Sequence, residues 1–176
     1  MGVATVPPII LAMPAPQRFR HAAIVGKPQA QGVRELLEEV ARFLVQQGLD
    51  VSLERGTAQA TGITAYDVLD AAQLGKQCDV TVVVGGDGTM LGIAREMAQF
   101  DMPLIGINQG RLGFITDIPV DRFREALAPM VRGEYEEEHR AMLDASVWRD
   151  GHCIFTSVAL NDVVVSRSAT AGMVEL

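Results

Sequence analysis

The run Thr81-Val82-Val83-Val84-Gly85-Gly86-Asp87-Gly88-Thr89-Met90-Leu91 joins an apolar, β-branched segment to three glycines, an acid and the start of an amphipathic segment. A β-branched run without polar alternation is typical of a strand covered on both faces, as in a parallel α/β sheet. The glycines permit positive φ and leave no Cβ to keep a ligand away from the backbone. The run therefore predicts a buried strand, a tight turn and a helix N-terminus. The free backbone N–H groups at a helix N-terminus attract anions, and phosphate in particular.

Asp87 is unexpected in such a turn, because a carboxylate repels phosphate. Its presence makes sense if it holds a metal, or accepts a hydroxyl proton or hydrogen bond during phosphoryl transfer. The turn is not a Walker A loop, which needs Lys-Ser/Thr after its last glycine, and it is not a Rossmann fingerprint, which needs glycine where Leu91 stands. A plain turn without a ligand is the alternative, since Asp-Gly is common in turns.

The composition is that of an ordinary globular protein: 176 residues, 48% hydrophobic and 21% charged. A net charge of −7 argues against a nucleic-acid binder, and no apolar segment is long enough to predict a membrane span. Cys78, Cys153 and the histidines lack metal-ligand spacing, so they predict neither a zinc site nor a disulfide framework, and we assign no residue as a metal ligand. The two cysteines are expected to be ordinary thiols of a cytoplasmic protein. Residues 1–20 are expected to be a flexible leader, since prolines interrupt their apolar part and no basic region precedes it.

Strand and helix patterns alternate through residues 21–133, which predicts an α/β nucleotide-binding domain with a parallel sheet. Besides the central strand, strands are expected at 22–26, 50–54 and 104–107, and helices at 33–48, 91–98 and 123–131. Residues 57–64 are predicted as a surface loop and 66–76 as a weak helix.

Residues 134–176 are predicted to be the incomplete start of an all-β domain. Residues 135–139 are charged and are expected to form a solvated strand or edge. Segments 143–148 and 153–160 flank Arg149-Asp150-Gly151-His152, which predicts a hairpin, and 163–165 is expected to be a further strand.

Two more polar segments are candidates for ligand contact. The strand that ends at Ile107 leads into a loop in which Asn108 offers an amide, and Gly110 and Gly113 permit close approach. Phe114 in this loop either covers an adenine ring or packs in the core. Because the carboxyl ends of parallel strands meet at one edge, this loop and the glycine turn are expected to face one crevice. Asn161-Asp162 interrupts an apolar run, so these side chains are expected to meet ribose hydroxyls or to bond the backbone of a turn.

Gly85-Gly86-Asp87-Gly88-Thr89 resembles a motif shared by NAD kinases, phosphofructokinases and the diacylglycerol and sphingosine lipid kinases. Residues 106–114 and 160–164 resemble the second and third motifs of NAD kinases, in the same order and spacing, and the resemblance runs from about residue 24 to the last residue. It implies transfer of the ATP γ-phosphate to the 2′-hydroxyl of the adenosine ribose of NAD, which makes NADP, with Mg²⁺ or another divalent cation. Asp87 would take the hydroxyl proton.

The resemblance also implies the nucleotide-binding residues, which are Gly85, Gly86, Asp87, Gly88, Thr89, Asn108, Gly110, Phe114, Asn161 and Asp162. A lipid kinase of the diacylglycerol type, a sugar-phosphate kinase and a non-catalytic dinucleotide-binding fragment stay open as alternatives. Members of the family are usually homo-oligomers and continue well beyond the position of Leu176. We therefore expect a homo-oligomer, and a chain that alone folds its first domain, has little activity and self-associates through unpaired strands.

Overall fold

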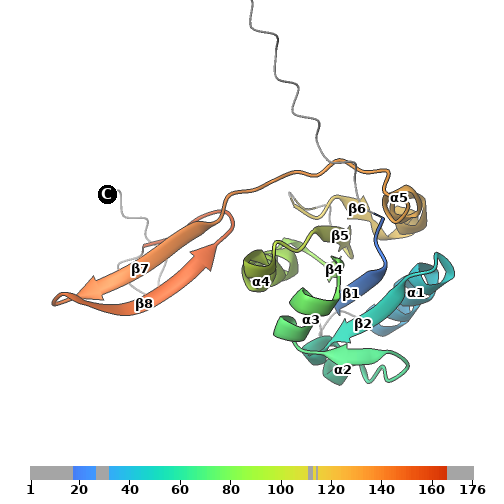
Figure 1. The fold of residues 1–176 in the computed structure, drawn as a ribbon, viewed down its shortest axis with the longest axis horizontal. Coiled ribbons are helices and arrows are strands. Elements are labelled where there is room, and N and C mark those ends of the chain that lie inside the picture. The colour runs from blue at the N-terminus through green and yellow to red at the C-terminus, as the bar shows by residue number, and fades with distance from the viewer. Residues whose placement is uncertain (1–17, 27–31, 111–112, 114, 166–176) are drawn as a thin grey trace, which may run out of the picture.

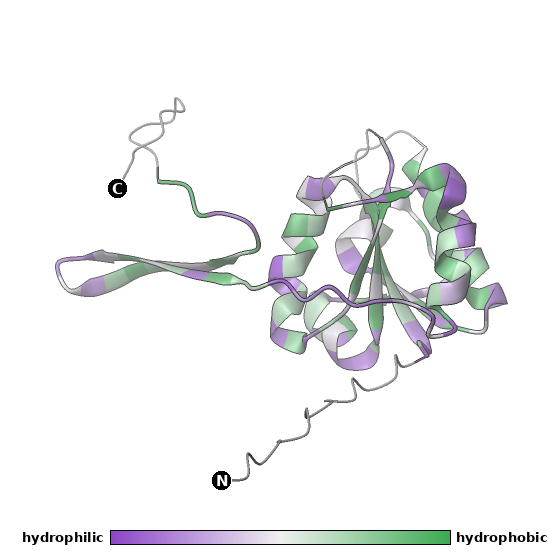
Figure 2. Ribbon diagram, turned by 90° about the horizontal axis from the view of Figure 1, so that it is seen from above, coloured by the Kyte–Doolittle hydropathy of each residue, from purple (hydrophilic) through white to green (hydrophobic). Residues whose placement is uncertain are grey.

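The structure is a computed structural model that describes residues 18–26, 32–110, 113 and 115–165. Its main part is a six-stranded parallel sheet in the order β3-β2-β1-β4-β5-β6. Figure 1 and Figure 2 show this sheet between helices on both faces, with a separate antiparallel hairpin, β7-β8, that projects from it. The predicted fold class, a parallel α/β sheet followed by β structure, is confirmed.

The strands of the sheet are β1 (His21–Gly26), β2 (Asp50–Glu54), β3 (Asp67–Leu69), β4 (Val80–Gly85), β5 (Leu104–Asn108) and β6 (Ile118–Pro119). The helices are α1 (Val33–Gln46), α2 (Arg55–Thr61), α3 (Ala71–Gln77), α4 (Asp87–Met97) and α5 (Phe123–Met130), with the short 3-10 helices η1 (Ala98–Phe100) and η2 (Val120–Arg122). The hairpin consists of β7 (Leu143–Arg149) and β8 (His152–Ala159). Each helix among the described residues is too short or too polar to cross a membrane.

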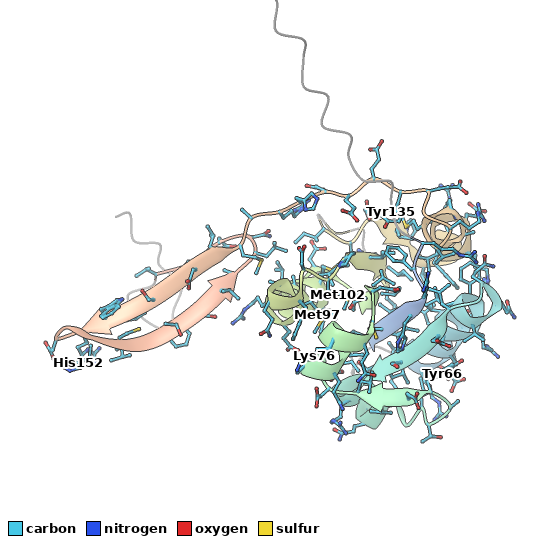
Figure 3. All side chains as sticks on the ribbon, viewed as in Figure 1. Tyr66, Lys76, Met97, Met102, Tyr135 and His152 are labelled. Carbon is cyan, nitrogen blue, oxygen red and sulfur yellow. The ribbon has the colours of Figure 1, made fainter. Side chains whose placement is uncertain are left out.

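Both faces of β4 are buried, as its sequence predicts. Val82 and Val84 pack into the cluster that α1 and α5 cover, whereas Val83 packs into the cluster that α3 and α4 cover. Met97 and Met102, labelled in Figure 3, belong to the second cluster. Since β4 has no solvent-facing side, it shows no polar alternation.

The strand order places the carboxyl ends of β1, β4 and β5 side by side. Gly26 is level with Val84, and Gly85 is level with Asn108. β1 and β4 are the neighbours at which the order changes direction, which is where open α/β sheets bind ligands. The predicted common edge for the glycine turn and the Asn108 loop is therefore confirmed.

The prediction of a surface loop at 57–64 is wrong, because α2 occupies Arg55–Thr61. The Glu54 carboxylate caps this helix, accepting hydrogen bonds from the backbone N–H groups of Gly56 and Thr57, both at 2.6 Å. Thr57 is buried, and its hydroxyl accepts a hydrogen bond from the Gly26 N–H at 3.1 Å. The threonine and the cap thus tie the helix to the end of β1, a tertiary effect that polar composition did not reveal.

The predicted helix at 66–76 is half wrong. Asp67–Leu69 pairs with β2 as the edge strand β3, and only the following Ala71–Gln77 is helical. Asp70 and Gln73 form a capping box at the junction, with Gln73 N donating to Asp70 Oδ1 at 2.9 Å. An edge position in the sheet, which is a tertiary feature, decides the state of the first three residues.

The hairpin confirms the prediction for 143–160. Asp150 (φ 50°) and Gly151 (φ 75°) form its turn, and His152 lies at its tip, far from the sheet (Figure 3). Residues 135–139 and 163–165 are not strands, contrary to prediction, and 163–165 are exposed. Strand propensity alone does not form a strand, and no described strand pairs with either segment.

Candidate functional site

The glycine turn connects β4 directly to α4. Gly86 is the N-cap residue of α4 in an extended conformation (φ −109°), Asp87 is the first helical residue, and no side chain caps the helix. None of Gly85, Gly86 and Gly88 is among the described glycines with positive φ, so the turn does not use the positive φ that glycine permits. An extended residue leads straight into the helix, and no left-handed residue is needed.

The glycines matter instead through the absence of Cβ atoms. A Cβ on Gly85 would lie 2.6 Å from Thr89 Oγ1, so packing excludes a side chain there. A Cβ on Gly86 or Gly88 would meet no atom within 4 Å among the described residues. These two positions therefore leave the backbone at the start of α4 open to a ligand.

The carboxylate of Asp87 is fixed against the loop that follows β5. Its Oδ1 accepts hydrogen bonds from Ile115 N at 3.2 Å, Thr116 N at 3.0 Å and Thr116 Oγ1 at 2.9 Å. A Cβ on Gly113 would overlap this oxygen, so only glycine lets the loop come so close. The first and second sequence motifs thus meet at one carboxylate.

Asn108 uses its polar atoms within the same loop. It is buried, its Nδ2 donates to Thr116 O at 3.2 Å and to Thr116 Oγ1 at 2.9 Å, and its Oδ1 accepts from Gly110 N at 2.8 Å. The amide therefore stabilises the loop, while its predicted contact with the nucleotide stays a prediction.

Thr116 is the residue of this site that the sequence did not reveal. It is fully buried and contacts both Asp87 and Asn108, although it lies beyond the motif that pointed to the loop. A threonine close behind a Gly-x-x-Gly loop is a weak signal, and only the fold shows that its hydroxyl lies between an amide and a carboxylate.

The third predicted segment is not joined to the glycine turn. Asn161 and Asp162 follow β8, are exposed, and form no hydrogen bond or ion pair with the described part of the turn. Exposure removes the cost of burying them, which was the physical reason for expecting partners. Phe114 lies outside the described residues.

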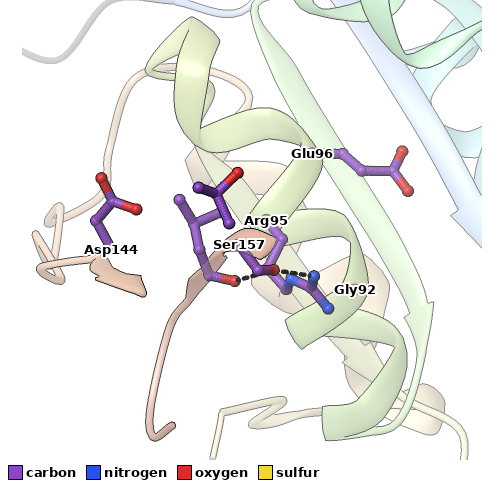
Figure 4. A pocket seen from close by; sticks show the side chains of 7 residues that line it. Gly92, Arg95, Glu96, Asp144 and Ser157 are labelled. Carbon is purple, nitrogen blue, oxygen red and sulfur yellow. Dashed lines mark hydrogen bonds between the residues drawn. The ribbon is translucent and has the colours of Figure 1, made fainter. Parts of the chain in front are cut away.

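A cavity of about 520 Å³ lies farther along α4, where the helix faces the hairpin (Figure 4). Arg95 Nη2 donates to Ser157 Oγ at 2.6 Å across it. The residues that line it are Gly92, Arg95, Glu96, Asp144, Thr156, Ser157 and Val158. The glycine turn is not part of the lining of this cavity, so the cavity is separate from the candidate site. The hydrogen bond from Arg95 connects α4 to β8 at a distance from the turn.

The two thiols do not supply a nucleophile to the site. Burial, with a contribution from the charge of Asp79, raises the pKa of Cys78 to about 12, so this thiol stays protonated at neutral pH. Cys153 is exposed on the hairpin. The described part of the chain also contains no group of three or more His, Cys, Asp or Glu side chains that could hold a metal ion.

Comparison with known proteins gives a consistent result. Residues 22–135 match the ATP-NAD kinase N-terminal domain. The chain is 61% identical over 159 residues to the NAD kinase of Polaromonas naphthalenivorans (strain CJ2), covering 90% of this chain and 55% of that protein. It is 62% identical over 163 residues to the NAD kinase of Methylibium petroleiphilum (strain ATCC BAA-1232 / LMG 22953 / PM1), covering 90% and 54%. The chain therefore spans about half the length of the curated relatives it matches.

A solved structure with the same fold is that of yeast NADH kinase complexed with NADH. The TM-score is 0.70 at 17% sequence identity, and the match covers 82% of this chain and 48% of the yeast chain. At this identity the likeness concerns the fold.

Proposed function

The chain belongs to the NAD kinase family, and from that premise we propose that the protein transfers the γ-phosphate of ATP to the 2′-hydroxyl of the adenosine ribose of NAD, giving NADP and ADP. The observation that carries this proposal is the start of α4: a helix without a side-chain cap, open at Gly86 and Gly88, with Asp87 in its first turn. An open helix N-terminus of this kind binds phosphate through its backbone N–H groups. The carboxylate beside it can accept the proton of a hydroxyl group that attacks the phosphate.

The proposed reaction forms a bond between the ribose oxygen and the γ-phosphorus. The bond from that phosphorus to the oxygen that bridges to the β-phosphate breaks, and ADP leaves with the electron pair. The proton of the hydroxyl passes to the Asp87 carboxylate. Because such transition states are loose, the main contributions of the protein are to orient the hydroxyl through Asp87 and to stabilise phosphate charge through backbone N–H groups.

The proposed nucleotide contacts follow the predicted residues. Gly86, Gly88 and Thr89 would contact phosphate, and the loop from Asn108 through Gly110 to Phe114 would contact the nucleoside. The remaining pair, Asn161 and Asp162, is proposed to bind ribose hydroxyls, which requires residues 160–165 to pack closer to the turn than they do here. A bound NADH in the yeast NADH kinase supports a dinucleotide as the ligand of this fold.

A divalent cation such as Mg²⁺ fits this site only as a companion of the triphosphate. The described residues offer no cluster of metal-ligating side chains, and Asp87 Oδ1 already faces hydrogen-bond donors. Mg²⁺ is commonly held by substrate phosphates with few protein ligands, and there it would neutralise phosphate charge. We also propose that the protein works in the cytoplasm, where free thiols such as Cys78 and Cys153 persist.

The proposal is tested by replacing Asp87 with asparagine in a chain extended to the length of its relatives. Asp87→Asn keeps the size of the side chain and removes its basicity, so NADP formation should fall by about 10²- to 10⁴-fold while ATP and NAD still bind. The measurement is the initial rate of NADP formation beside calorimetric titration with each nucleotide.

Asp101→Asn is the matched control, because Asp101 follows η1, is exposed and has φ 52°, a conformation that asparagine tolerates. It should keep the activity of the parent chain. A parent chain that binds both nucleotides but makes no NADP would show a non-catalytic binding module, and an active Asp87→Asn variant would remove the role assigned to the carboxylate.

A further inference from the structure

The hydroxyl of Thr116 has one proton, and the structure shows where that proton goes. Asn108 Nδ2 can only donate, so the Thr116 oxygen accepts at 2.9 Å from the amide. The hydroxyl proton then points to Asp87 Oδ1, also at 2.9 Å. Amide, hydroxyl and carboxylate form one directed chain of hydrogen bonds, in which each bond polarises the next.

The same threonine provides a second donor to the carboxylate through its backbone. Thr116 N and Ile115 N both donate to Asp87 Oδ1, at 3.0 and 3.2 Å. Three donors directed at one oxygen stabilise the ionised carboxylate, because a charged carboxylate oxygen accepts hydrogen bonds more strongly than an oxygen of the neutral acid. Because the three donors come from two neighbouring residues, they also fix the rotation of the carboxylate.

Packing confines the threonine on more than one side. Thr116 is fully buried, and a Cβ on Gly106 would lie 2.9 Å from its Cγ2 methyl group. Asn108 holds the other end of the residue by donating to Thr116 O at 3.2 Å. Thr116 is therefore held by β5 on one side and holds α4 through Asp87 on the other.

We propose that Thr116 is a positioning residue of the phosphoryl-transfer site, which keeps the Asp87 carboxylate ionised and in the one rotation that receives the proton of the acceptor hydroxyl. This inference rests on the proposed role of Asp87. Asn108 acts through Thr116: because its amide donates to the Thr116 hydroxyl oxygen, the hydroxyl proton is directed to the Asp87 carboxylate.

The test compares Thr116→Val, which removes the hydroxyl at nearly constant volume, with Thr116→Ser, which retains it. Thr81→Val is the matched control, since Thr81 is also fully buried but lies in the middle of the sheet. In a chain extended to the length of its relatives, Thr116→Val should lower kcat by roughly 10²-fold with the KM values for ATP and NAD within about threefold of the parent, because misplaced catalytic groups cost about that much. Thr116→Ser should recover most of kcat, and Thr81→Val should leave it unchanged.

A second measurement does not depend on activity. The amide proton shifts of Ile115 and Thr116 report by NMR on ionisation of the carboxylate that they contact, and they can be followed against pH in the 176-residue chain. The midpoint should rise in Thr116→Val and stay near that of the parent in Thr116→Ser.

The two measurements separate the inference from the function. A parent chain that makes no NADP contradicts the proposed function, and the NMR midpoints still decide whether Thr116 controls Asp87. A folded Thr116→Val variant with the parental midpoint overturns the inference, and so does a Thr116→Ser variant that is as impaired as Thr116→Val.

Discussion

The hydroxyl of Thr81 lies in the centre of the sheet without a hydrogen-bond partner among the described residues. Thr81 is fully buried in β4, between β1 and β5. Burial of an unpaired hydroxyl costs about 1–3 kcal/mol in proteins. Valine has the same shape and an equal or better tendency to form strands.

We therefore expect Thr81→Val to raise the free energy of unfolding by about 1 kcal/mol, measured by urea unfolding of the 176-residue chain. Thr116→Val is the opposite case, since its hydroxyl bonds both Asn108 and Asp87, and it should lower the stability by about 1–3 kcal/mol. A loss of stability in Thr81→Val would mean that the hydroxyl is bonded in solution.

At this scale the sequence predicts a residue's chemistry better than its contacts. Asp87 was identified because an acid is anomalous in a phosphate turn. Thr116 was not identified, because the sequence does not show what the hydroxyl of a buried threonine contacts. Thr81 and Thr116 are both buried threonines, yet of these two the structure shows a carboxylate contact among the described residues only for Thr116. Gly113 is predicted to permit close approach, but only the structure shows that the group that comes close is the Asp87 carboxylate.

Among the elements, the contact between α3 and η1 depends on a single glycine. A Cβ on Gly75 would overlap the ring of Phe100, whereas a Cβ on Gly92 in α4 would meet nothing within 4 Å among the described residues. Both glycines are helical, so alanine is favoured at each by about 1 kcal/mol of intrinsic propensity. Packing decides between them.

We expect Gly75→Ala to destabilise the chain by about 1–3 kcal/mol, because the Phe100 ring has to move. Gly92→Ala should be neutral or stabilise it by up to about 1 kcal/mol. The check is urea unfolding of both variants and of Gly75→Ala combined with Phe100→Ala, which removes the ring. If Gly75→Ala is equally harmful without the ring, steric overlap is not the cause.

The element predictions succeeded where a segment decides its own state and failed where the sheet decides it. The boundaries of β2 and the start of α1 follow from apolar periodicity. Residues 67–69 became a strand because β2 has a free edge to pair with, which no local pattern encodes. The capping box of Asp70 and Gln73 was readable in the sequence and would have placed the start of α3.

For the whole molecule, the sheet and its ligand edge follow from the order of strands and glycine turns, whereas the arrangement beyond residue 133 does not. The predicted boundary near residue 134 stays a prediction. The hairpin itself is predicted by its turn residues, and what the structure adds is that one side of it is exposed and largely apolar. We call this side the hairpin face: Leu143, Ala145, Val147, Phe155 and Ala159, with Ser157 opposite Ala145 as its polar member. Val147 is paired with Phe155 and Leu143 with Ala159, so these side chains lie on one side of the hairpin.

The hairpin face is exposed: Leu143 is 43%, Val147 49% and Phe155 59% accessible. A hairpin of two strands is marginally stable alone, and it gains most when its apolar face is covered. Since the expected oligomer is made of identical copies, a second copy of this chain is the partner that is always present, and two such faces are self-complementary about a twofold axis.

We therefore expect the 176-residue chain to self-associate through the hairpin face, and Phe155→Glu to prevent it by placing a charge at the most exposed of its large apolar side chains. The measurement is static light scattering over a range of protein concentrations. Ala72→Glu is the matched control, since it adds the same charge at an exposed position of α3 and should associate like the parent. A parent chain whose mass is that of a monomer at every concentration, or a Phe155→Glu variant that associates as strongly as Ala72→Glu, would show that the hairpin face does not join two copies.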